Sequence, residues 1–196
     1  MTPESDSWPP AAAPAADDAE AEPPSWLSLD VQIEDDGWIA CGDLEAAIAA
    51  AIAALARTLG PSPPAAASIA LAADADVCAL NREFRGEDKP TNVLSFPAAP
   101  GNRSGVPAGR RYLGDIILAR ETVLAEAAGA GIPVRHHVQH LAVHGLLHLI
   151  GHDHAADADA ARMEGIEIAV LADLGVANPY ADTDPAGLPA IKADAS

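Results

Sequence analysis

The sequence predicts a single domain of the α/β (α+β) class, built as a two- or three-layer sandwich of strands and helices. Two observations lead to this prediction. Segments with the two-residue alternation of a half-buried strand are interspersed with segments whose apolar residues recur every three or four positions, as on one face of a helix. The chain has 196 residues, a length that suits one domain with a sizeable core.

Periodicity and capping signals define the expected elements. In the first helix, Leu44, Ile48 and Leu55 recur at helical spacing, Asp43 can cap the N-terminus, and Gly60 ends the helix. The expected strands are 28–34, 67–72, a short one ending at Pro97, and 112–118. The expected helices are 44–59, one opened by Asp74 or Asp76 and closed by Gly86, 120–130, 134–150 and 158–174.

Two of these elements contain residues with a more specific expectation. In the second helix, Val77, Leu80 and Phe84 share one face and are expected to point into the core. In the last strand, Gly114 and Asp115 interrupt the apolar run. Asp115 is therefore expected to be either a turn residue or a polar group directed at the functional site.

Both ends of the chain and one loop are expected to lie outside the packed domain. Residues 1–25 are rich in Pro, Ala, Asp and Glu, so they cannot bury enough apolar surface to offset their ordering entropy, and a disordered acidic arm is expected. Residues 98–111 are rich in Pro, Gly and Arg, which favours a mobile loop. Residues 181–196 are expected to form a flexible tail, which leaves 26–180 as the domain.

A formal net charge of −18 by itself opposes a nucleic-acid partner, but the charge is unevenly distributed. Residues 1–56 hold twelve acids and no Lys or Arg, and residues 155–196 hold eight acids and two bases. The segment between them holds nine acids and nine bases, with clusters at Arg82, Arg85 and Lys89 and at Arg103, Arg110 and Arg111. A local basic surface can form there; the alternative is a set of solvated side chains.

The cysteines and the hydropathy pattern bear on location. Cys41 and Cys78 are isolated, with no C-x-x-C pairing, so both are expected to be small buried hydrophobes in a reducing cytoplasm. No apolar run approaches the ~20 residues of a membrane span. The N-terminus has no basic residue before an apolar core, so no secretory signal is expected.

Three histidines have the spacing of a metal site. His144 and His148 are four residues apart, so on a helix they share one face and can reach the same ion. Gly151 tolerates the left-handed conformation that commonly follows a last helical turn, so the chain can reverse there and bring His154 to that ion. Three neutral nitrogen ligands leave a fourth position open for water, as in catalytic zinc sites. One Zn²⁺ per chain is therefore expected.

The spacing H-x-x-x-H-x-x-G-x-x-H is that of the metzincin proteases, with one difference. Those enzymes carry Glu after the first histidine as general base, whereas this chain has Gly145. A metallopeptidase is therefore an alternative that lacks its base. The spacing itself disfavours a set of ordinary surface or core histidines.

Four separated motifs occur in a fixed order along the chain. They are Leu80-Asn81 through Phe84-Arg85, Lys89-Pro-Thr-Asn-Val-Leu-Ser-Phe-Pro97, Leu113-Gly114-Asp115-Ile116, and Val143 through His154. Together with Met163-Glu164 and Asn178-Pro179-Tyr180, they closely resemble the YbeY family of bacterial endoribonucleases, also called rRNA maturation factors. The resemblance covers roughly residues 28 to 180.

This resemblance implies a fold and a function. The implied fold is a small mixed, mostly parallel sheet packed with helices, and the implied metal is zinc on the residues matching His144, His148 and His154. The implied activity is single-strand-specific RNA cleavage in 16S rRNA 3′-end maturation and ribosome quality control. The implied partners are single-stranded RNA, an rRNA precursor and the small ribosomal subunit in the cytoplasm, with no DNA and no membrane.

The residue matching Arg85 is functionally important in that family. A guanidinium binds phosphate through two parallel hydrogen bonds, so Arg85 is expected to be catalytic, by clamping the scissile phosphate or opposing its developing charge. The alternative is a structural ion pair at the end of its helix. Lys89, Arg110 and Arg111 are further candidates for substrate binding.

In the expected mechanism, either a zinc-bound hydroxide attacks a phosphodiester of single-stranded RNA or the zinc ion activates that phosphodiester. Its general base is open, because Gly145 replaces the usual glutamate. The water loses its proton through the metal alone, or with help from His152, Asp115 or the RNA 2′-OH. Asp153 is expected to orient a ligand imidazole. His136, His137 and His140 are expected at the surface or behind the ligands.

Two other functions remain open from the sequence. A metallopeptidase is favoured by the histidine spacing and opposed by Gly145. A non-catalytic ribosome assembly factor would use zinc only to stabilise its fold. The first would cleave casein and leave single-stranded RNA intact, and the second would support ribosome maturation with a mutated site.

Overall fold

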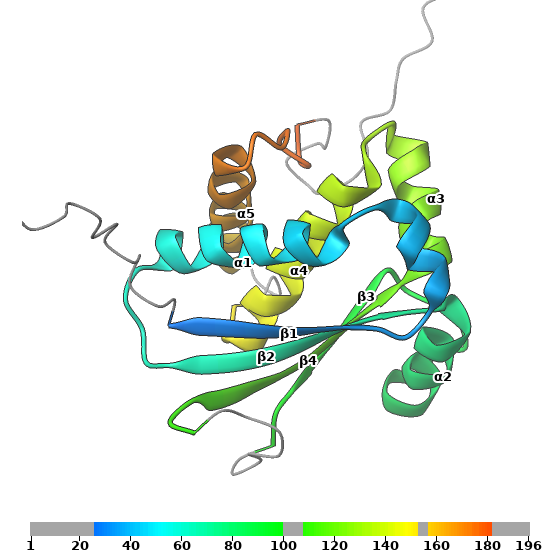
Figure 1. Cartoon of the computed structure of the whole chain (residues 1–196), viewed down its shortest axis with the longest axis horizontal. Coiled ribbons are helices and arrows are strands. Elements are labelled where there is room, and N and C mark those ends of the chain that lie inside the picture. The colour runs from blue at the N-terminus through cyan, green and yellow to red at the C-terminus, as the bar shows by residue number, and fades with distance from the viewer. Residues whose placement is uncertain (1–25, 100–107, 153–156, 182–196) are drawn as a thin grey trace, which may run out of the picture.

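The computed structural model describes residues 26–99, 108–152 and 157–181 (Figure 1). Several sequence-based expectations concern residues outside these ranges. They are the acidic arm 1–25, most of the loop 98–111 with Arg103, the tail from residue 182 onward, and the site residues Asp153 and His154. In the described ranges, no helix is long and apolar enough to cross a membrane.

A mixed sheet of four strands forms the centre of the fold. The strands are β1 (Leu27–Ile33), β2 (Ala65–Ala72), β3 (Val93–Pro97) and β4 (Arg111–Ala119), in the order β1-β2-β4-β3. β1, β2 and β4 run parallel, and β3 pairs antiparallel with β4, so that Ser95 lies opposite Ile116. The prediction of a small mixed, mostly parallel sheet is confirmed, and β3 forms one edge of that sheet.

Helices cover both faces of the sheet. They are α1 (Leu44–Leu59), α2 (Asp74–Arg85), α3 (Arg120–Ala130), α4 (Val134–Leu149) and α5 (Asp157–Asp173), with a 3-10 helix, η1 (Asp36–Cys41), before α1. α1 and α4 lie on one face, α5 packs against both of them from outside, and α2 lies on the other face (Figure 1). The predicted layering of sheet and helices is confirmed.

The main core lies between the sheet and the α1 and α4 layer. Its fully buried side chains include Ile48, Leu55, Ile69, Leu71, Ile116, Leu118, Leu146 and Leu147. Each such side chain stabilises the fold by roughly 1.5–3 kcal/mol relative to an exposed one. A smaller cluster on the other face packs α2 against the sheet through Ala72, Val77, Leu94 and Ala119. The larger core fixes α4, which carries the histidines.

The predicted elements agree closely with the structure. α1 and α3 have the expected bounds, and α2 and β3 end where expected, at Gly86 and Pro97. The remaining strands and helices differ from the expected ranges by one or two residues at an end. Asp43 caps α1 as predicted, since its Oδ1 accepts a hydrogen bond of 2.9 Å from the amide of Ala46. The 3-10 helix was not predicted. It is capped by Asp35, whose Oδ1 accepts from the amide of Gly37 at 2.9 Å.

Two local predictions were wrong, and a third was right only in part. Phe84 is 61% exposed, because α2 buries Val77 and leaves Phe84 at its outer end, with the ring edge-on to Phe96 at a centroid distance of 5.2 Å. Cys41 and Cys78 are free thiols but only half-buried. The last strand was expected to be interrupted at Gly114, and β4 continues through this residue, but its pairing with β2 shifts register there, with Ala66 opposite Tyr112 and Ser68 opposite Asp115. Gly114 has φ +139°, and a Cβ there would lie 2.1 Å from the carbonyl oxygen of Phe96.

Gly145 lies where α4 approaches β3 and β4 most closely. A Cβ at this position would lie 2.9 Å from Cγ2 of Ile116 and 3.1 Å from Oγ of Ser95, and Ser95 donates a hydrogen bond to the Gly145 carbonyl at 3.2 Å. Both neighbours belong to paired strands and have little freedom to move. A glutamate at residue 145, as in the metzincins, therefore has no room in this packing.

We expect Gly145→Ala to lower the free energy of unfolding by about 1–3 kcal/mol, because it overpacks the contact with Ile116. Urea denaturation of both proteins measures this difference. Gly129→Ala in α3 is the matched control, since nothing lies within 4 Å of its added Cβ, and it should be stabilising by up to about 1 kcal/mol. Equal effects of the two substitutions would contradict the close approach at Gly145.

Candidate metal centre

α4 presents a row of histidines on one face. His140, His144 and His148 are spaced four residues apart, so they lie one above another along the helix. The Nε2 atoms of His144 and His148 are 3.2 Å apart. Two nitrogen ligands on a tetrahedral zinc, each at 2.0–2.1 Å, lie about 3.3–3.4 Å from one another. The two imidazoles therefore already have the spacing of neighbouring ligands of one ion.

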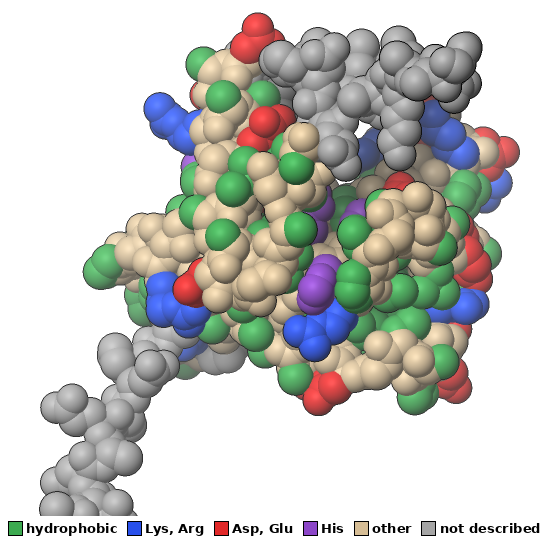
Figure 2. Space-filling view, turned by 90° about the horizontal axis from the view of Figure 1, so that it is seen from above, with side chains coloured by type: hydrophobic (Ala, Val, Ile, Leu, Met, Phe, Trp, Pro, Cys, Tyr) green, Lys and Arg blue, Asp and Glu red, His purple; other side chains and the backbone are tan. Residues whose placement is uncertain are grey.

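Both imidazoles open into a cleft of about 640 Å³. Histidine side chains lie in and beside a hollow on the helical face of the molecule (Figure 2). The lining residues are Arg85, Thr91, Asn92, Val93, Ser95, Pro97, His144, His148, Gly151 and His152. The cleft therefore combines two candidate metal ligands, an arginine, and the hydroxyl and amide groups of the loop and strand from Thr91 to Ser95. Its volume suits a small ligand or part of a polymer.

The end of α4 has the geometry that its sequence predicts. Gly151 follows the helix with φ +98°, a conformation that glycine adopts without strain. His152, next along the chain, lines the cleft. His154, the third predicted ligand, and Asp153 lie just beyond the described residues.

Arg85 lies at the C-terminal end of α2 and reaches the same cleft as His144 and His148. Its side chain is exposed, and no described residue forms a hydrogen bond or an ion pair with it. A structural ion pair, the alternative role for Arg85, therefore has no partner in the described part of the chain.

The other three basic candidates do not line the cleft. Lys89 forms an exposed ion pair with Glu87 at 3.1 Å. The Arg110 guanidinium donates to the carbonyl oxygens of Trp26 and Ala65 at 2.8 and 3.1 Å, which ties the starts of β1 and β2 to β4. Arg111 borders a separate cavity together with Trp26 and Ile150. The described contacts therefore give Arg110 a structural role.

Asn92 lines the cleft, whereas Asp115 does not. Asp115 is exposed, accepts a hydrogen bond of 2.5 Å from the Tyr112 hydroxyl, and is not a lining residue. Asn92 lines the cleft, and its amide donates to Glu126 at 3.0 Å. Glu126 in turn lies 2.7 Å from Nε2 of His137. Glu126 and His137 thus hold Asn92 from outside the cleft.

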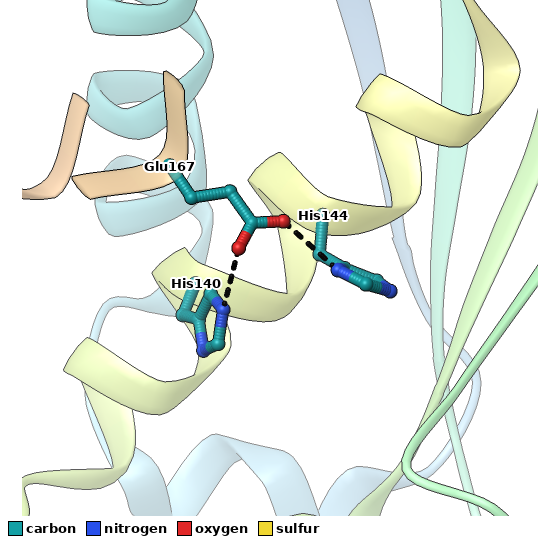
Figure 3. Close-up of side chains that lie close together, drawn as sticks. All are labelled: His140, His144 and Glu167. Atoms are coloured by element: carbon teal, nitrogen blue, oxygen red, sulfur yellow. Dashed lines mark hydrogen bonds and ion pairs between the residues drawn. The ribbon is translucent and has the colours of Figure 1, made fainter. Parts of the chain in front are cut away.

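The buried carboxylate of Glu167, which contacts two histidines of α4, was not predicted from the sequence. Glu167 of α5 is fully buried, and its carboxylate lies between His140 and His144 (Figure 3). Its Oε1 lies 2.9 Å from Nδ1 of His144, and its Oε2 lies 3.2 Å from Nε2 of His140. The Tyr180 hydroxyl also donates to Oε2. A signal existed in the sequence, because Glu167 lies on the buried face of α5 with Met163 and Val170, where an unpaired acid is costly.

The protonation of this cluster follows from its contacts. Burial raises the pKa of Glu167, but hydrogen bonds from His140, His144 and Tyr180 outweigh burial and lower this pKa to about 2. Burial and the neighbouring carboxylate raise the pKa of Tyr180, so its hydroxyl keeps the proton. An ionised carboxylate only accepts hydrogen bonds, so Nδ1 of His144 carries the proton, and the neutral ring has its lone pair on Nε2.

His140, His144 and Glu167 also form a group that could itself hold a metal ion. One ligand atom from each lies within 4.8 Å of the others. In this arrangement, however, both Glu167 oxygens already accept hydrogen bonds, and Tyr180 shares one of them. The described residues thus offer two placements that share His144: one with His148 at the cleft, and one with His140 and Glu167 behind it.

The fold and the site define a class of protein. It is a small α/β domain in which a histidine-bearing helix borders an open polar cleft and could hold a metal ion. A family profile described as Endoribonuclease YbeY matches residues 31–175. The chain belongs to this family, as the resemblance of its motifs indicates.

Individual relatives agree with this assignment. A protein named Endoribonuclease YbeY from Azorhizobium caulinodans is 52% identical over 79% of this chain and 97% of its own length. Proteins of the same name from Sphingopyxis alaskensis and Rhodopseudomonas palustris are 46% and 47% identical, over 75% and 80% of this chain and 90% and 94% of their own lengths. The similarity therefore extends over nearly the whole of each relative.

Proposed function

We propose that this protein is a zinc-dependent, single-strand-specific endoribonuclease that acts in 16S rRNA 3′-end maturation and ribosome quality control. One observation carries the proposal: Arg85, which has no partner among the described residues, lines the same cleft as the paired imidazoles of His144 and His148. Membership in the YbeY endoribonuclease family supports RNA as the substrate. The rRNA precursor, the small ribosomal subunit and the cytoplasmic location rest on the family resemblance alone.

The proposed ligands of one Zn²⁺ per chain are His144, His148 and His154. The 3.2 Å between the two Nε2 atoms suits this ion, and Glu167 leaves the lone pair of His144 on the nitrogen that zinc requires. When bound, zinc supplies a Lewis acid that activates water and polarises a phosphoryl oxygen. This placement is preferred to the one with His140 because it leaves the Glu167 hydrogen bonds intact.

The chain's own residues then position the RNA. A guanidinium can make two parallel hydrogen bonds to a phosphodiester, and Arg85 offers one in the cleft that His144 and His148 also line. Its charge opposes the negative charge that grows on the phosphoryl oxygens during attack. Thr91, Asn92 and Ser95 also line this cleft and offer polar contacts to the sugar and phosphate.

His152 is the candidate that the cleft offers for the general base. It lines the same cleft as His148, and a neutral imidazole can accept a proton. Gly145 leaves no room for the glutamate that performs this task in metzincins. Asp115 accepts from Tyr112 and lies away from the cleft, so it is a weaker candidate.

One assay separates the proposed nuclease from a metallopeptidase. We expect the zinc-loaded protein to cut a labelled RNA that carries the 16S rRNA 3′ precursor sequence, and to leave casein intact. Annealing a complementary strand should protect the RNA from cleavage, because a strand that is held in a duplex cannot separate and enter the cleft alone. Cleavage of casein with intact RNA would favour the peptidase, and equal cleavage of duplex RNA would contradict single-strand specificity.

A further inference from the structure

Glu167, His140 and Tyr180 form a buried cluster that contacts His144, a proposed zinc ligand. We propose that Glu167 is a positioning residue for His144: its carboxylate fixes the imidazole in the tautomer whose Nε2 can bind the ion. Tyr180 and His140 hold that carboxylate in place. This inference rests on the zinc site of the proposed function.

The two oxygens of Glu167 have separate contacts. Oε1 lies 2.9 Å from Nδ1 of His144, and Oε2 is shared by His140, at 3.2 Å, and by Tyr180. A fully buried carboxylate is costly unless donors surround it, and here donors reach both oxygens. Two anchors on Oε2 therefore leave Oε1 aimed at one nitrogen of one histidine (Figure 3).

The contact between Glu167 and His144 determines which ring nitrogen of His144 can bind a metal ion. A neutral imidazole carries one proton, and a carboxylate can only accept, so the proton belongs on Nδ1 and the lone pair on Nε2. Nε2 of His144 is the atom that lies 3.2 Å from Nε2 of His148. Without Glu167, the proton can occupy either nitrogen, and the form with Nε2–H cannot bind a metal through Nε2, the nitrogen that lies next to His148. Removing such a partner of a ligand typically weakens metal binding about 10- to 100-fold.

His140 distinguishes positioning from direct ligation. If Glu167 positions His144, then His140→Ala removes one anchor of the carboxylate and the protein still binds one zinc per chain. If zinc instead sat on His140, His144 and Glu167, which are close enough to hold it, His140→Ala would lose the ion. Zinc content of the purified variant decides between the two, and loss of zinc would overturn the inference.

The main test uses Glu167→Gln, which keeps the size of the side chain and replaces one accepting oxygen by a donating amide. We expect its dissociation constant for zinc, measured by competition with a chelator, to rise about 10- to 100-fold. In zinc-free protein, ¹⁵N NMR of the His144 ring should show protonated Nδ1 in the wild type and a mixture of tautomers in the variant. A general loss of packing would not move this tautomer signal selectively.

Asp159→Asn is the matched control, because Asp159 is an exposed acid on the same helix, α5, and makes no described hydrogen bond to an imidazole. It should leave zinc affinity and the His144 tautomer unchanged. If Glu167→Gln does not fold, Tyr180→Phe decides, since it removes one anchor of Oε2 and should weaken zinc binding by about tenfold, the lower end of the range. Unchanged affinity and tautomer in the folded variant would overturn the inference.

Zinc affinity and the His144 tautomer are measured without RNA. They therefore distinguish failure of the positioning role of Glu167 from failure of the zinc site itself. If the wild type binds one zinc that His148→Ala removes, but Glu167→Gln binds it as tightly as the wild type, only the positioning role fails. If the wild type binds no zinc, or His148→Ala retains it, the zinc site of the proposed function fails as well.

Discussion

His148→Ala is expected to lose its zinc and to cut RNA at least ~10³-fold more slowly than the wild type. The variant removes one nitrogen of the pair that lies 3.2 Å apart, and two remaining histidines cannot hold the ion against water. Metal catalysis supplies several kcal/mol of transition-state stabilisation, and each 1.36 kcal/mol corresponds to a factor of ten. Zinc content and cleavage rate, measured on the same preparation, check both parts of the prediction.

His136→Ala is the matched control for this experiment. His136 lies in the first turn of the same helix and does not line the cleft. The control should keep one zinc per chain and the wild-type rate. Normal small-subunit maturation in cells that carry only His148→Ala would instead support a non-catalytic assembly factor.

Arg85→Lys is expected to keep its zinc and its stability while RNA cleavage falls about 10²- to 10³-fold. Lysine retains the positive charge but loses the planar fork that binds phosphate through two hydrogen bonds. Removing one such stabilising group from a transition state typically has an effect of this size. Because Arg85 is exposed and has no described partner, its replacement breaks no contact of the fold. Single-turnover rates, zinc content and urea denaturation of the variant test the three expectations.

Arg82→Lys provides the comparison on the same helix. Arg82 is exposed and pairs with Asp88 at 3.4 Å, an interaction worth only about 0–1 kcal/mol, and it does not line the cleft. Its cleavage rate should stay near that of the wild type. A wild-type rate for Arg85→Lys with zinc bound would show that Arg85 does not clamp phosphate.

The helices and strands were predictable because each has a clear local signal. The apolar spacing of α1, with Asp43 before it and Gly60 after it, defines its bounds without reference to the rest of the chain. The strand order β1-β2-β4-β3 has no such local signal, and the family resemblance supplied the mixed sheet. Phe84 shows what helical spacing cannot predict. The spacing places Phe84 on the same helix face as Val77, but it does not show how far the sheet extends beneath that face.

Residue spacing predicted the candidate site only where its residues are close in sequence, and the family resemblance supplied Arg85. His144 and His148 share one helix face, so their spacing was sufficient. Glu167 comes from another helix, 23 residues away from His144, and only the packing of α5 on α4 brings the two together. The position of Arg110 could not be predicted, because the sequence does not show the backbone carbonyls that its guanidinium contacts in the fold.

Returning zinc to chelator-stripped wild-type protein tests the central claim most directly. RNA cleavage and bound zinc are measured on the same samples as zinc is added in steps. A catalytic ion on His144, His148 and His154 predicts a stripped protein with almost no cleavage and a rate that rises in proportion to bound zinc up to one ion per chain. Full cleavage by the stripped protein, or one bound zinc per chain with no cleavage, would contradict a zinc-dependent nuclease.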